Sequence, residues 1–132
     1  MRVQRVLFLA STLGCCYTSM LMAQDAVQVD PKHYTILTEN AQVRVLKVHY
    51  GPHEKSVMHS HPATVAVFLS SGNGRFTFPD GKTQDLTFKL GDAQYSDATT
   101  HLPENTSDQG FDVVVIELKG KAAKSAKAET AK

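Results

Sequence analysis

The chain has 132 residues, a formal net charge of +1 and two cysteines. This length corresponds to a single domain. The charge is unevenly distributed, because residues 24–118 carry seven Lys or Arg against twelve Asp or Glu, which leaves that span at −5. An acidic body of this kind has no electrostatic basis for binding a polyanion, so we exclude a nucleic-acid partner.

Residues 1–23 predict an export signal. Two arginines precede an apolar stretch, and Ala23 is the small residue that signal peptidase prefers before its cut. The stretch is shorter than the roughly 20 apolar residues of a membrane-spanning helix. We therefore expect a periplasmic or secreted protein with no transmembrane helix in its mature form. Lipidation at Cys15 and an amphipathic helix retained on a cytoplasmic protein are the alternatives.

Both cysteines lie in this segment, so a chain cut after Ala23 has no disulfide, thiolate ligand or cysteine nucleophile. At the other end, residues 119–132 are rich in Lys and Ala and lack large apolar residues. Such a tail cannot bury enough surface to offset the entropy of ordering, so we expect disorder, or a weak tether to anionic polymers. The predicted organisation is a signal peptide at 1–23, a lead-in at 24–34, one domain at 35–118 and a tail at 119–132.

The body has the period of two that is typical of strands. Segments 42–50, 64–70, 75–90 and 111–118 alternate apolar and polar residues, with a change of phase at Val45-Leu46 that suggests a β-bulge. Residues 79–82, Pro-Asp-Gly-Lys, predict the turn of a hairpin within 75–90. No window has a convincing helical period, so the fold class is all-β, either a sandwich or a barrel.

The stretch "MHSHPATVAVF" places two histidines, His59 and His61, at the start of an alternating run. Residues two apart on a strand share a face. If the strand is regular from Met58 to Ser70, both histidines share the interior face with Val65 and Val67. Imidazoles on an apolar face are either metal ligands or buried polar groups that need partners.

These histidines, with Gly51 and Gly72 around them and Gly91, His101 and Asn105 downstream, resemble the two motifs of the cupin superfamily. The resemblance covers roughly residues 35–118 and is greatest to small single-domain bacterial cupins of unassigned function. It implies a small jelly-roll-like β-barrel and a metal held by His59, His61 and His101. It also implies a small-molecule ligand or substrate, and a homodimer that pairs through an outer strand, for which residues 33–40 are the candidate.

The chain departs from the family pattern where the motif has a glutamate, because that position falls at Val65 or Ala66. The second motif departs too, with Asp97 and Thr99 in place of a proline and a glycine. Three neutral imidazoles can still hold a divalent ion, but something anionic should accompany its charge. We expect a hydroxide, an anionic ligand, or a nearby acid such as Glu104, Asp97 or Glu54.

The metal stays open between zinc, which a nitrogen-only site loaded outside the cytoplasm favours, and iron, which the resemblance to dioxygenase-type cupins favours. A scaffold that has lost its metal is the alternative. Glu104 and Asn105 are candidates for the surroundings of the site, although holding a loop by hydrogen bonds is their more ordinary role. Three further histidines are predicted to lie on the surface, namely His33, His49 and His53.

Two functions from different classes fit these residues. The first is a dioxygenase-like or Lewis-acid enzyme that acts on a small anionic or enolisable molecule. The second is a non-catalytic module that binds such a ligand with or without metal. A purely structural barrel is a third. Turnover that depends on His101 distinguishes the first from the others.

Overall fold

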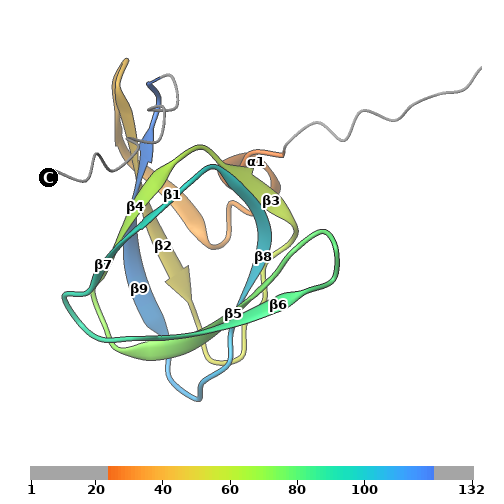
Figure 1. Ribbon diagram of the computed structural model, residues 1–132. Coiled ribbons are helices and arrows are strands. Elements are labelled where there is room, and N and C mark those ends of the chain that lie inside the picture. Colours follow the sequence, from red (N-terminus) through yellow and green to blue (C-terminus); the bar gives the residue numbers. More distant parts are fainter. Residues whose placement is uncertain (1–23, 121–132) are drawn as a thin grey trace, which may run out of the picture.

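The computed structural model describes residues 24–120, so the predicted signal segment and residues 121–132 of the predicted tail lie outside the described residues. Within these residues a short helix, α1 (Ala26–Val29), precedes nine strands (Figure 1). The all-β prediction is confirmed. The strands are β1 (Tyr34–Glu39), β2 (Val43–Tyr50), β3 (His59–His61), β4 (Thr64–Phe68), β5 (Gly72–Thr77), β6 (Thr83–Phe88), β7 (Ala93–Ser96), β8 (Thr99–Asn105) and β9 (Phe111–Leu118).

The strands form two sheets. One has five strands in the order β1-β2-β9-β4-β7, and the other has four in the order β3-β8-β5-β6. Every pair of strands is antiparallel. Apart from β1-β2 and β5-β6, which are consecutive in sequence, neighbours in each sheet are distant in sequence, as in a jelly roll. The jelly-roll-like prediction is therefore confirmed, although the two sheets do not close into a barrel.

The predicted hairpin is present as β5 and β6, and Gly81 adopts a φ of 81° in its turn, a conformation that glycine adopts at no steric cost. The predicted bulge is also present, but in the partner strand. Between Ile36 and Thr38 the register of β1 skips one residue opposite Val45 and Leu46, whereas β2 itself pairs with β9 without interruption. The extra residue, Leu37, is 55% exposed.

The core lies between the sheets and is largely aromatic. Phe68 stacks on Phe88 with ring centroids 4.1 Å apart, and Phe88 packs edge-on against Phe111 at 5.0 Å. Burying side chains of this size is worth about 1.5–3 kcal/mol each. Helix α1 lies beside β3, where Ala26 is fully buried and Ser60 N–H donates to Gln24 O at 2.7 Å (Figure 1). The segment before the first strand is therefore part of the packed structure. This four-residue helix, which the sequence did not predict, cannot span a membrane, and no other helix is described in residues 24–120.

The prediction of which side chains point inward on the strand after the histidines is wrong. Val65 and Val67 were expected to share the interior with His59 and His61, but the chain bends at Pro62-Ala63 between β3 and β4. The bend reverses the alternation, so that β4 directs Thr64, Ala66 and Phe68 inward, and Val65 and Val67 do not line the cavity between the sheets.

Candidate metal centre

Three histidines from two neighbouring strands meet inside the molecule. His59 and His61 lie on β3, and the antiparallel register places His101 of β8 directly opposite His59. All three are buried, and each offers a ring nitrogen such that the three nitrogens lie within 4.8 Å of one another. The ring planes of His59 and His61 are perpendicular, as are those of His59 and His101. The structure thus brings together the three residues that the sequence singled out.

Hydrogen bonds at Nδ1 fix the orientation of two of the imidazoles, those of His59 and His61. The Nδ1 atom of His59 lies 2.8 Å from Val57 O, and that of His61 lies 2.7 Å from Glu117 Oε1. Both acceptors lack a proton of their own at neutral pH, so each Nδ1 is the donor. In a neutral imidazole this leaves Nε2 as a free lone pair, the form in which histidine binds metal.

The donor set fits a divalent transition metal. Within residues 24–120, His59 Nε2 and His101 Nδ1 are buried without a hydrogen-bond partner. Leaving such groups unpaired costs about 1–3 kcal/mol each. A metal ion bound to three nitrogens would remove part of that cost, and three histidines with positions left open are a known zinc ligand set.

Burial and mutual repulsion favour neutral rings. Burial, with the added repulsion of His61, lowers the pKa of His59 to about 4. The same two causes, with His59 contributing, lower the pKa of His101 to about 3. Both rings are thus uncharged at neutral pH, as metal binding requires.

Glu117, which the sequence analysis missed, is the acid beside this cluster. Its side chain is 2% exposed; Oε1 accepts from His61 and Oε2 from Arg44 Nε at 2.5 Å. Arg44 also makes a bidentate ion pair with Asp25, with distances of 2.7 and 2.9 Å. Burial opposes ionisation of Glu117, but the bonds from His61 and Arg44 outweigh it and hold its pKa below the ordinary value. A charged carboxylate therefore stands behind His61.

The acids that were expected near the metal have other partners. Glu104 lines the cavity and pairs with Lys55 at 3.7 Å, Asp97 accepts from the Tyr95 hydroxyl, and Glu54 binds Lys32. Asn105 has the loop-holding role, because its amide donates to the carbonyls of Gly51 and Gln109 at 2.8 Å.

The surface prediction for the other histidines is right for two and wrong for one. His49 and His53 are exposed beside Asp112 and Asp108. His33 is buried, and its two ring nitrogens lie 2.7 Å from the carboxylate of Asp30 and 3.1 Å from that of Glu54.

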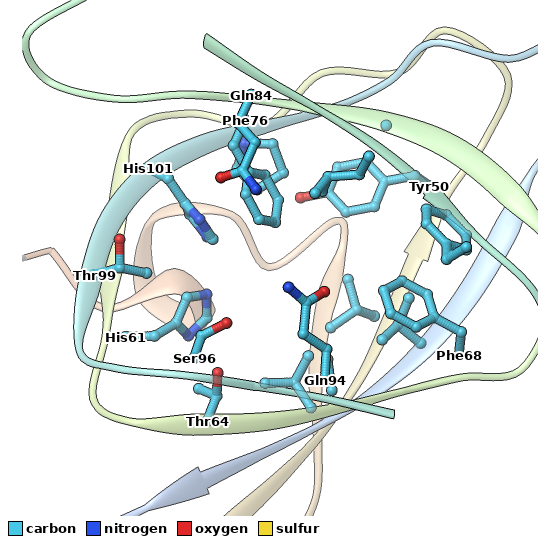
Figure 2. Close-up of a pocket in the computed structure, with 18 of the residues that line it drawn as sticks. Tyr50, His61, Thr64, Phe68, Phe76, Gln84, Gln94, Ser96, Thr99 and His101 are labelled. Carbon is cyan, nitrogen blue, oxygen red and sulfur yellow. The ribbon is translucent and has the colours of Figure 1, made fainter. Parts of the chain in front are cut away.

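A cavity of about 320 Å³ opens beside the histidines. Figure 2 shows His61 and His101 at one end of it, near the hydroxyls of Thr64, Ser96 and Thr99. The opposite end is aromatic, with Tyr50 and Phe68. The amides of Gln84 and Gln94 point into the space between. Among the described residues that line the cavity, none is Lys or Arg, and the two acids are Asp97 and Glu104.

Solved structures of cupins have the same fold. A cupin domain from Bordetella pertussis is 25% identical to this chain, with a TM-score of 0.61; the match covers 66% of this chain and 92% of that one. The chain is a small protein of the cupin superfamily. A protein with a double-stranded β-helix domain from Klebsiella pneumoniae is 22% identical to the chain described in this structure and matches it with a TM-score of 0.55. That match covers 68% of this chain and 78% of the Klebsiella chain. No family model and no curated protein matches the chain.

Proposed function

We propose that this cupin is an exported protein that binds a divalent transition metal, zinc or iron, through His59, His61 and His101. Its cavity would take a small anionic or enolisable molecule. The observation that carries the proposal is the meeting of three buried imidazoles, two of which have a buried nitrogen with no partner in the described structure. A bound ion would supply Lewis-acid polarisation of a ligand oxygen.

The lining of the cavity favours the enolisable class over molecules with a free carboxylate. Since no described lining residue is Lys or Arg, a ligand's negative charge has no cationic side chain of that kind to pair with, and the metal is its main partner. An enolisable molecule without a carboxylate, such as a β-diketone, is mostly neutral in solution and develops charge only on the oxygen that meets the ion. The hydroxyls beside His61 would orient that polar end, and the aromatic end would bury an apolar body. For scale, a cavity of roughly 150 Å³ holds benzene, so the space suits a molecule of one or two rings.

The metal is tested by elemental analysis of untagged mature protein. We expect near-stoichiometric zinc or iron in the wild type and its loss in His101→Ala. His49→Ala is the matched control, because His49 is 58% exposed and lies away from the cluster. A wild type without metal under loading with either ion would contradict the proposal.

The ligand class is tested with a pair of probes of similar size, the enolisable diketone benzoylacetone and the carboxylate 3-phenylpropanoate. We expect benzoylacetone to bind the metal-loaded protein more tightly, measured by titration calorimetry, and His101→Ala to abolish the difference. Tighter binding of the carboxylate would refute the preference. Mass spectrometry of the same mixtures separates an enzyme, which forms product, from a non-catalytic binding module.

Two further parts of the proposal have their own tests. Export predicts a secreted or periplasmic protein with Gln24 as its first residue, which N-terminal sequencing checks. A homodimer through β1 is supported by the place of this strand at the edge of its sheet and by the exposure of Ile36 and Leu37, at 41% and 55%. Sedimentation of wild type and Leu37→Asp checks it, since the charged variant should be monomeric.

A further inference from the structure

We infer that Glu117 is the carboxylate of this metal centre. It would fix His61 from behind and supply the negative charge that the histidine motif lacks, with Arg44 and Asp25 as the residues that position it. This inference rests on the proposed metal site and identifies residues outside the motif that the site depends on.

The register of the sheet explains how a residue on β9 can take this place. Of the two positions at which the family pattern expects a glutamate, Ala66 is the one that faces the cavity. Strand β4 pairs with β9 so that Ala66 lies opposite Val115 and Thr64 lies opposite Glu117. Ala66 and Glu117 are therefore diagonal neighbours on one face, with Cα atoms roughly 7–8 Å apart. A carboxylate at position 117 of β9 is therefore close to the position on β4 at which the family pattern has a glutamate.

The contacts of Glu117 show that this group is built to stay charged and oriented. Its two oxygens bind His61 and Arg44, and its side chain is 2% exposed. A buried carboxylate is costly unless it is paired and hydrogen-bonded. The carboxylate also determines which nitrogen of His61 keeps its proton, and carboxylate partners of this kind raise the basicity of a ligating imidazole.

The chain of contacts ends on the segment before the first strand. Asp25 holds the guanidinium of Arg44 at both terminal nitrogens, and the backbone of Gln24 and Asp25 pairs with Ser60, the residue between the two motif histidines. Residues 24 and 25 thus contact the site twice, through the backbone of β3 and through Arg44. Removing them should loosen the metal although neither is a ligand.

The test is the zinc affinity of Glu117→Gln, measured by competition with a chelator. Gln keeps the size and one acceptor but removes the charge. We expect affinity to fall 10- to 100-fold, the usual effect of losing such a partner. Asp112→Asn is the matched control, because Asp112 is an exposed acid on the same strand, and its affinity should equal that of the wild type. Asp25→Asn, a change at a partly exposed residue, serves if the buried variant does not fold, and should lower affinity about three- to tenfold.

A further readout comes from cobalt-substituted protein. The cobalt-substituted proteins should differ in their visible spectra between wild type and Glu117→Gln, since His61 changes its donor strength. Wild-type affinity retained in both Glu117→Gln and Asp25→Asn would overturn the inference and leave the metal site intact. A wild type that binds none of zinc, iron and cobalt would overturn the proposed function itself.

Discussion

Removing Arg44 should destabilise the metal-free protein by about 3–4 kcal/mol. The side chain of Arg44 is 14% exposed and pairs with Glu117, which is 2% exposed. Deleting one partner of a buried ion pair costs about 3–5 kcal/mol, because the other charge stays buried. Asp25 adds little, since its side chain is 28% exposed and a pair of that kind is worth about 1 kcal/mol or less. We expect the lower part of this range of destabilisation, because His61 still donates a hydrogen bond to the Glu117 carboxylate in Arg44→Met.

The measurement is unfolding by urea in the presence of EDTA. Circular dichroism monitors the transition, because the chain has no tryptophan. For a domain of roughly 100 residues, a loss of 3 kcal/mol lowers Tm by about 12–24 °C. The double variant Arg44→Met with Glu117→Gln should recover at least half of the loss, because it leaves no charge buried alone. Lys47→Met, at an exposed position on the same strand, should change stability by less than about 1 kcal/mol. A loss below about 1 kcal/mol in Arg44→Met would refute the reasoning.

Three other predictions follow from single contacts. The hydrogen bond from Lys32, and after it the one from the Gly51 amide, lowers the pKa of Glu54 to about 2. The contribution of the Glu54 carboxylate to folding stability is therefore present above pH 4.5 and is lost as pH falls towards 2. Over that range of pH, Glu54→Gln should lose less stability than the wild type in an acid titration, and an equal loss would contradict the assignment. Ala66→Glu should tighten zinc binding about tenfold, or 1.4 kcal/mol, in a competition with a chelator. Val65→Glu, at a position outside the cavity, should leave zinc affinity unchanged, and equal effects of the two variants would mean that the register of β4 is misread. Gly72→Ala would place a methyl group 3.0 Å from the Phe88 ring, and thermal unfolding should show a loss of about 1–3 kcal/mol, an expectation that an unchanged Tm would disprove.

The sequence was informative where the signal is local. Alternation of apolar residues identified the strands around the hairpin, and the spacing of His59 and His61 placed both rings on one face of β3. The prediction for Val65 and Val67 was wrong, because a two-residue bend reverses the alternation and nothing in the apolar pattern marks it. Pro62 was the available signal, since proline interrupts a strand ladder.

Glu117 shows why the rest of the site could not be predicted from the sequence. Its interior position is readable, because Phe111, Val113, Val115 and Glu117 alternate along β9 and an acid on that face needs a partner. Its partner cannot be read from the sequence, because His61 lies 56 positions away and the two residues stand on strands of different sheets, β3 and β9. The acids predicted to lie near the metal therefore included residues close to a histidine in sequence, such as Glu104.

A metal centre on a sheet depends on which side chains face one cavity rather than on which strand carries them. Neighbouring strands offer diagonal positions on one face, so a carboxylate on β9 can lie near a position on β4 that lacks one. The position on β9 does require an outer partner, because a carboxylate this deeply buried needs a cation, and Arg44 on β2 is in place to provide it. A cupin that has alanine at the glutamate position but keeps an acid on the last strand and an arginine on the strand beside it should therefore still bind metal, whereas loss of both the acid and the arginine should accompany loss of the metal.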